Sequence, residues 1–98
     1  MAQIVYSVRA LQDLERLFQF LAEHDATAAF DSAQAITSSV EMLASHPYVG
    51  HRIEGGELRE LVVSFGRTGY VALYRYRPER GEVRILTVRH QRELDYPL

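Results

Sequence analysis

The C-terminal part of the chain contains three short strand-like segments separated by turns, and this pattern constrains the fold more than any other feature. The segments cover residues 58–63, 70–77 and 83–93. Gly66 and Gly69 lie in the first turn, and Pro78 and Gly81 lie in the second. Segments rich in Val, Leu, Ile and Tyr that are bounded by Gly and Pro predict β-strands joined by tight turns. We therefore expect a three-stranded meander.

The N-terminal part predicts a strand and then a first helix. Residues 2–8 alternate between apolar and polar side chains, which is typical of a short strand. From Ala10 onward, apolar residues recur at steps of three and four, at Leu11, Leu14, Phe18 and Leu21. This spacing places them on one face of a helix, and we expect Asp13 on the opposite, polar face.

A second helix is predicted to follow directly. Asp25 is expected to cap it, because a carboxylate at this position accepts hydrogen bonds from the free N–H groups of the first turn. The helical stripe continues at Phe30, Ala33, Ile36, Val40 and Leu43. Pro47 ends the helix, since the residue before a proline is pushed out of the helical region. Residues 46–57 are then expected to form one long loop.

The predicted order of elements is β-α-α-β-β-β. This order defines an α+β fold in which a helical hairpin packs on one face of a mainly antiparallel four-stranded sheet. At 98 residues the chain is expected to form a single domain, residues 1–98.

Composition excludes several classes of protein. The chain has no cysteine, no export-type N-terminus and no apolar run near the ~20 residues that a membrane span needs, so we expect a cytoplasmic protein without a membrane partner. It has no nucleophile elbow and no phosphate-binding glycine loop. His46 and His51 are spaced for metal binding, but no further ligands accompany them. We therefore expect neither a metal ion nor any other cofactor, including a small-molecule cofactor.

The basic residues are the most informative part of the composition. All 11 are arginine, although the formal net charge is −2. Most of them lie after residue 58, and in the third strand Arg75 and Arg77 share a sequence segment with Tyr70, Tyr74 and Tyr76. One interpretation is that these arginines pair across strands with Glu60, Glu79 and Glu82. The other is that they form a partner-binding surface, for which the candidates are Arg59, Tyr74, Arg75, Arg77, Arg89, His90 and Arg92.

Four groups of residues give the chain a family resemblance over nearly its whole length. They are Leu43-x-x-x-Pro47-x-x-Gly50, Arg59-Glu60-Leu61, Tyr70-x-x-x-Tyr74-Arg75 and Ile85-Leu86-x-Val88-x-His90-x-Arg92-Glu93. In this order, on a chain of this length, they resemble the ParE/RelE superfamily of toxins from type II toxin–antitoxin modules, which are also called plasmid stabilisation proteins.

The resemblance implies one of two mechanisms. RelE-like members cleave mRNA on the ribosome, with cations that bind the scissile phosphate and a C-terminal general acid or base. The corresponding strand positions are Val62, Ser64 and Val71, and only Arg92 and Tyr96 match that pattern. This favours the ParE-like branch, whose members bind DNA gyrase without catalysis. A ribonuclease that uses Arg59, Arg75, His90, Arg92 or Tyr96 stays open, as does a binding module without toxicity.

The resemblance also implies the partners. A cognate antitoxin would cover the toxin with a segment that folds as it binds, along a sheet edge or beside the helices. DNA gyrase is the expected target, and the ribosome with its mRNA is the alternative.

Overall fold

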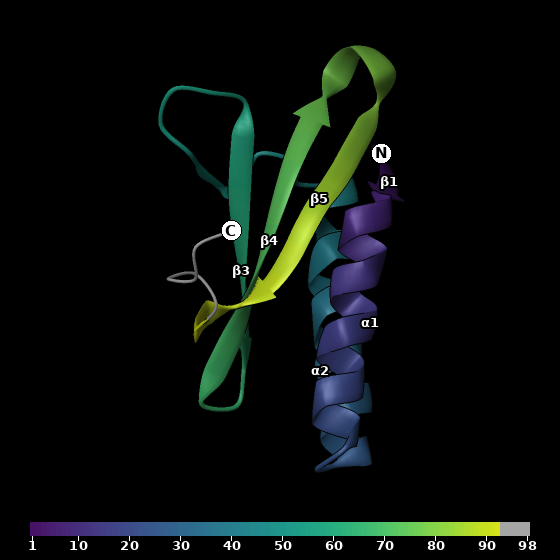
Figure 1. The fold of residues 1–98 in the computed structure, drawn as a ribbon. Coiled ribbons are helices and arrows are strands. Elements are labelled where there is room, and N and C mark those ends of the chain that lie inside the picture. The colour runs from purple at the N-terminus through teal and green to yellow at the C-terminus, as the bar shows by residue number, and fades with distance from the viewer. Residues whose placement is uncertain (93–98) are drawn as a thin grey trace.

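The computed structural model describes residues 1–92 and has the predicted α+β architecture. Two helices, α1 (Val8–Ala22) and α2 (Ala26–Glu41), form an antiparallel hairpin that covers one face of the sheet (Figure 1). The strands are β1 (Gln3–Tyr6), β2 (His51–Arg52), β3 (Leu58–Phe65), β4 (Thr68–Arg77) and β5 (Glu82–His90). Short 3₁₀ turns follow α2 and β4, at Met42–Ala44 and Pro78–Arg80. None of the helices in the described part is long and apolar enough to cross a membrane.

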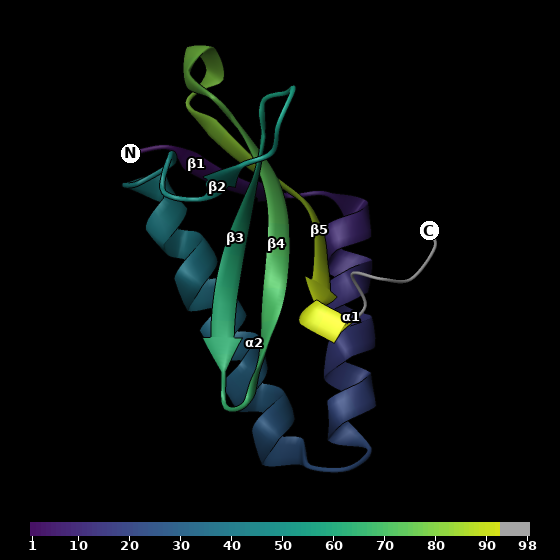
Figure 2. The ribbon, with the colours of Figure 1, turned by 90° about the vertical axis from the view of Figure 1, so that its left-hand side faces the viewer.

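The sheet has five strands in the order β1-β5-β4-β3-β2. The chain enters the sheet parallel to its last strand, because β1 pairs with β5 in parallel, and all other neighbouring pairs are antiparallel. Figure 2 shows β3, β4 and β5 side by side with both helices behind them. The predicted meander is therefore confirmed, and its strands form the centre of the sheet.

The predicted number of four strands is too small by one. The missed strand, β2, lies inside the segment that we expected to be a plain loop, and it pairs with β3 through His51 and Arg52. A strand of two exposed residues buries nothing on either face. It therefore leaves no alternation in the sequence by which it could be recognised.

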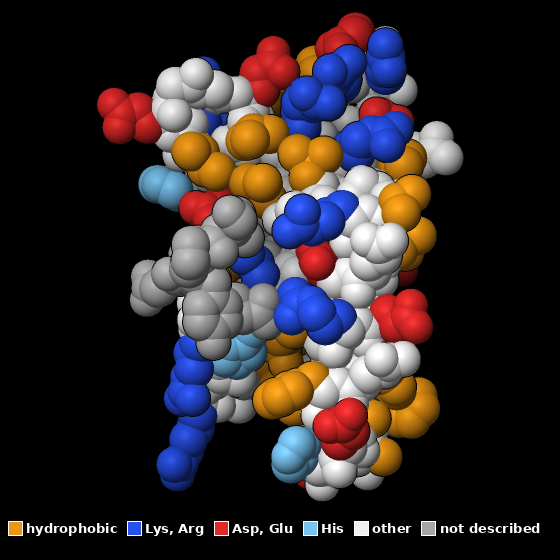
Figure 3. Space-filling view, in the orientation of Figure 1, with side chains coloured by type: hydrophobic (Ala, Val, Ile, Leu, Met, Phe, Trp, Pro, Cys, Tyr) orange, Lys and Arg blue, Asp and Glu red, His pale blue; other side chains and the backbone are white. Residues whose placement is uncertain are grey.

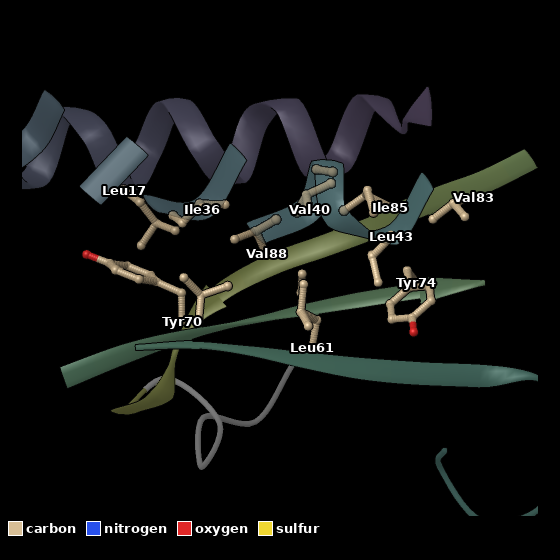
Figure 4. Close-up of a cluster of buried hydrophobic side chains, with 13 residues drawn as sticks. Leu17, Ile36, Val40, Leu43, Leu61, Tyr70, Tyr74, Val83, Ile85 and Val88 are labelled. Carbon is tan, nitrogen blue, oxygen red and sulfur yellow. The ribbon is translucent and has the colours of Figure 1, made fainter. Parts of the chain in front are cut away.

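The hydrophobic core lies between the helical hairpin and the sheet. Ile36, Val40 and Leu43 contribute from the α2 side, while the sheet contributes residues from β3, β4 and β5 (Figure 4). The largest fully buried side chain is Tyr74 of β4. Asp25 caps α2 as predicted, and its side chain accepts a hydrogen bond from the backbone N–H of Ala28 at 3.1 Å.

The inward face of α1 differs from the predicted stripe. Ala10, Asp13 and Leu17 are the buried residues of this helix, whereas Leu11 is exposed. The prediction failed because it followed the largest apolar residues and placed the carboxylate of Asp13 in water. Phe30 of α2, also predicted to face inward, is exposed and packs edge-on against Phe18 at 5.1 Å between ring centroids.

Asp13 is buried because the sheet gives it a hydrogen-bond partner. Strand β5 contains a bulge at Leu86, since Leu73 pairs with Thr87 and Tyr74 pairs with Ile85. Beyond Ile85 no strand of residues 1–92 lies beside the outer edge of β5, and α1 takes that place. The Asp13 Oδ2 accepts from the Val88 N–H at 3.0 Å, and the Ser7 hydroxyl donates to the Leu86 carbonyl at 2.8 Å.

Candidate partner-binding surface

The face of the sheet without helices is the candidate partner-binding surface, and we call it the open face. Side chains alternate between faces along a strand. The buried residues Leu61, Val63, Tyr70, Ala72 and Tyr74 mark the helix-covered side. The open face therefore consists of Leu58, Glu60, Val62 and Ser64 of β3, Val71, Leu73, Arg75 and Arg77 of β4, and Glu82, Arg84, Thr87 and Arg89 of β5. Figure 2 views the molecule from this side, with the helices behind the sheet.

Arginines gather at the end of the open face where β4 leaves the sheet and β5 enters it. Arg75 and Arg84 are direct cross-strand partners, and Arg77 is opposite Glu82. The Arg84 Nη2 lies 3.2 Å from the Glu82 Oε1, so this guanidinium has an acidic partner. Like charges directly opposite one another destabilise a sheet. The Arg75 and Arg84 pairing is therefore a cost to the fold, which a bound anionic partner would relieve.

Two paired valines lie in the middle of the open face, next to an arginine. Val62 of β3 is exposed and is the cross-strand partner of Val71, which in turn is opposite Arg89. The Arg89 Nη2 lies 4.0 Å from the Glu60 Oε2, and the Arg89 Nε is buried without a hydrogen-bond partner among the described residues. Val71 is only 3% exposed. None of Val62, Ser64 and Val71, where a nuclease of this fold is expected to carry cations, has a charged side chain.

Tyr74, predicted to contact a partner, is fully buried, and this prediction is wrong for its side chain. Its hydroxyl donates to the Pro47 carbonyl at 2.8 Å and accepts from the Gly50 N–H at 2.9 Å. Burial raises the pKa of the Tyr74 phenol above its ordinary value, and the Gly50 hydrogen bond and the positive charge of Arg59 oppose part of that rise. Tyr74 therefore holds the segment after α2 against the sheet.

Arg59 takes part in the same anchoring. Its Nη1 donates to the carbonyls of Tyr48 and Gly50, at 3.0 and 2.9 Å, and its guanidinium lies 5.1 Å from the centre of the Tyr48 ring. We call Pro47, Gly50, Arg59 and Tyr74 the tyrosine latch. Arg59 thus lies on the opposite side of the sheet from Arg75, and the structure does not bring these two candidates together.

His90 is engaged on both ring nitrogens. Its Nδ1 accepts from the Arg92 N–H at 3.1 Å, which assigns the proton of the neutral ring to Nε2, and Nε2 donates to the Thr68 hydroxyl. The ring also packs edge-on against the buried Tyr70, with 5.4 Å between centroids. Arg92 is exposed just after β5, and Tyr96 lies outside the described residues.

Two arginines of α1 were not among the candidates, although they are exposed. The Arg9 Nε and the Arg16 Nη2 lie 3.8 and 3.7 Å from the Asp13 Oδ1. Arg9, Asp13 and Arg16 are spaced by four and three residues, which is a sequence signal that they share one helix face. The predicted apolar stripe assigned this face to solvent, away from the sheet.

Comparison with known proteins identifies the class. A model of the "ParE toxin of type II toxin-antitoxin system, parDE" matches residues 4–95. The chain therefore belongs to the ParE toxin family of type II toxin–antitoxin systems. It is similar to Toxin RelE3 of Caulobacter vibrioides, with 38% identity over 93 residues that cover 95% of this chain and 98% of the relative. Toxin RelE2 of the same organism is 35% identical over 94 residues, which cover 96% and 100%.

Solved structures share the fold. The chromosomal ParDE system from P. aeruginosa contains a chain that superimposes with a TM-score of 0.73 at 19% identity, covering 92% of this chain and 96% of that one. The intact E. coli RelBE toxin–antitoxin complex gives a TM-score of 0.63 at 13% identity, covering 91% and 95%. Both branches of the superfamily are thus represented among the similar structures, and the family resemblance seen in the sequence is confirmed.

Proposed function

We propose that this toxin acts by binding DNA gyrase and holding it on cleaved DNA, without cleaving a substrate itself. The observation that carries the proposal is that three positions of the open face, where a ribonuclease of this fold is expected to carry cations, have uncharged side chains. Cleavage of RNA develops negative charge on the scissile phosphate, and that charge must be balanced by cations close to it. Val62 and Val71 are directly paired there, and Ser64 is the next residue on the same side of β3. None of them can supply a cation.

The arrangement of the other candidates supports the same proposal. A general acid or base needs a nitrogen or oxygen that is free to exchange a proton with the substrate. Both ring nitrogens of His90 already have partners within the protein. Arg59 uses its Nη1 to hold two loop carbonyls in the tyrosine latch. A binding function requires only a stable surface, which the open face provides.

One observation favours a second candidate function, which is cleavage of mRNA on the ribosome. The relatives with the highest sequence identities above are both named as RelE toxins. The name of a relative does not assign a mechanism to this chain, but it makes the ribosome the alternative target that an experiment should test. Either target would place the toxin's action in the cytoplasm.

The antitoxin is proposed to neutralise the toxin by covering the open face. The similar solved structures include toxin–antitoxin complexes, which supports a protein partner of this kind. The exposed Val62 and the neighbouring Leu73 offer apolar contacts, and Arg75 and Arg77 offer positive charge to an acidic segment. Occupation of this surface would prevent the toxin from reaching its target.

Controlled expression in a sensitive bacterial host tests the proposal. We expect filamentous cells with an induced DNA-damage response, and rescue when a cognate antitoxin is expressed with the toxin. Rapid arrest of translation with cleaved messages would show the ribonuclease instead. Unimpeded growth by a folded protein would show a binding module without toxicity.

A further inference from the structure

A line of arginines follows β5 from the arginine-rich end of the open face to α1, and it extends beyond the surface assigned above. Arg77, Arg75 and Arg84 lie at its start. Ser7 bonds to Leu86 further along the strand, and Asp13 bonds to Val88, which brings Arg9 and Arg16 beside the same edge. We call these five residues, Arg9, Arg16, Arg75, Arg77 and Arg84, the arginine track. Figure 3, in which the open face is turned to the left and the helices lie on the right, shows blue side chains from the top to the middle of the view.

The acidic groups on the track are recessed beneath the arginines. The side chains of Arg9 and Arg16 are 62% and 52% exposed, whereas the carboxylate between them, Asp13, is 10% exposed. At the other position, the side chain of Arg84 is 38% exposed and that of Glu82 is 18% exposed. A partner that approaches the track therefore meets guanidinium groups before it meets carboxylates.

The buried carboxylate of Asp13 also fixes the positions of the two α1 arginines. One of its oxygens is held by the Val88 N–H, and the other lies within 4 Å of both guanidinium groups. Side chains that are already positioned lose less conformational entropy when a ligand binds. Arg9 and Arg16 are consequently prepared to contact an anion together.

The length and the positive charge of the track fit a linear polyanion. From Arg84 to Val88 the strand extends roughly 13 Å at ~3.3 Å per residue. One nucleic-acid strand carries a negative charge at every phosphate, so more than one phosphate can lie along that length. The residues along it include the polar Ser7, Gln12 and Thr87. The exposed apolar Phe20 lies one helical turn beyond Arg16 on α1.

We propose that the arginine track binds the phosphodiester backbone of a nucleic acid. Guanidinium groups hold phosphate oxygens bidentately, and phosphate contacts of this kind carry no base specificity. The source of the phosphates is either duplex DNA or single-stranded RNA. Binding at the track does not depend on the identity of the toxin's protein target.

Fluorescence anisotropy with the purified toxin and two labelled probes, a 20-base-pair duplex and a 20-nucleotide RNA, tests the proposal without gyrase or ribosomes. Two track variants are compared with wild type: Arg9→Gln with Arg16→Gln, and Arg75→Gln with Arg84→Gln. The second removes an unfavourable like-charge pairing, so it remains informative if the first folds poorly. The control, Arg52→Gln with Arg67→Gln, removes the same charge from exposed positions away from the track.

Each track variant is expected to bind the probes on the order of tenfold more weakly at 150 mM salt, and to lower the slope of log affinity against log salt by about two. The control should keep the wild-type slope. Preference for the duplex identifies DNA as the source of phosphate, preference for the other probe identifies RNA, and either supports the proposal. The proposal would be overturned if the wild type bound neither probe, or if the track and control variants lost the same affinity. It would also be overturned if the track variants lost affinity for an acidic peptide but kept their affinity for both probes.

Discussion

The tyrosine latch and the open face lie on opposite sides of the same strands, and they differ in what they do. In the latch, the Tyr74 hydroxyl satisfies two backbone groups, and Arg59 satisfies two more carbonyls. On the open face, Arg75 and Arg77 make no ion pair or side-chain hydrogen bond with the described residues, and Val62 is exposed. The first region is built to be stable, and the second is available for binding.

This difference explains why the family motifs identify the fold of the protein and not its target. Pro47, Gly50, Arg59 and Tyr74 all belong to the groups of residues that carry the resemblance, and all of them serve the latch. The residues by which a gyrase-binding toxin and a ribonuclease are expected to differ are Val62, Ser64 and Val71, which lie on the other side of the sheet. The motifs therefore identify the fold, while the choice of target is expected to depend on residues outside them.

The largest effect is expected when Gly50 is replaced by alanine. A Cβ atom there would lie 2.5 Å from the Tyr74 ring and hydroxyl and 2.9 Å from the Glu60 carbonyl. Tyr74 is fully buried and Glu60 contributes backbone, so neither can move away easily. We expect a loss of about 3 kcal/mol in the free energy of unfolding, measured by urea denaturation. The control is Gly56→Ala, where the nearest atom is 4.0 Å away, and equal losses in both variants would show that the latch is not tightly packed.

The next largest effect is expected for Tyr74→Phe. This change leaves the Gly50 N–H and the Pro47 carbonyl without their partner and should cost about 2 kcal/mol of unfolding free energy. Tyr76→Phe is the matched control, because the half-buried Tyr76 hydroxyl makes no hydrogen bond with a described residue. The same denaturation experiment measures both variants. If Tyr74→Phe left the free energy of unfolding unchanged, the hydroxyl would not contribute to the stability of the tyrosine latch.

A smaller effect is expected at high pH. Because burial raises the pKa of Tyr74 in the folded state, its contribution to stability is complete below the unfolded pKa near 10 and is lost as the pH rises through the folded value. The difference in stability between wild type and Tyr74→Phe should therefore shrink above pH 10. Urea denaturation at pH 8 and pH 10.5 measures it. Tyr6, whose pKa is also raised by burial and by Glu41, remains in both proteins and does not affect the difference.

The smallest effect on stability, and the clearest effect on function, is expected for Arg75→Ala. Its guanidinium is opposed by Arg84, so its removal should change the free energy of unfolding by less than about 0.5 kcal/mol. We expect growth inhibition to weaken nonetheless, measured as colony counts after induction, whereas Arg67→Ala in the β3–β4 turn should remain fully toxic. Unchanged toxicity of folded Arg75→Ala would exclude this residue from the target surface.

The order of elements could be predicted from the sequence because each element leaves a periodic pattern of its own. The meander, the helical hairpin and the Asp25 cap all follow from local spacing and are present in the structure. The inward face of α1 could not be predicted in this way, because Asp13 is buried only through its bond to Val88, 75 residues away. The spacing of three between Ile85 and Val88, where two is usual for a strand, does signal the β5 bulge.

The site was less predictable than the fold for the same reason. Side chains alternate between the two faces of a strand, so the tyrosines and the arginines of 70–77 lie on different faces, but the alternation does not show which face the helices cover. Tyr74 therefore looked like a contact residue until the helices were placed, and Arg59 looked like a neighbour of Arg75. Long-range pairings decide these positions, and a single sequence contains no direct record of them.

The measurement that tests the central claim most directly is a pair of assays on one preparation of purified toxin. In the first, the toxin is added to DNA gyrase and supercoiled plasmid, and in the second to ribosomes that are translating a defined mRNA. A toxin that acts by binding should cause gyrase-linked cleaved DNA to accumulate, with a dose near one toxin per gyrase site, and should leave the mRNA intact. Cleavage of the mRNA together with normal gyrase activity would contradict the account.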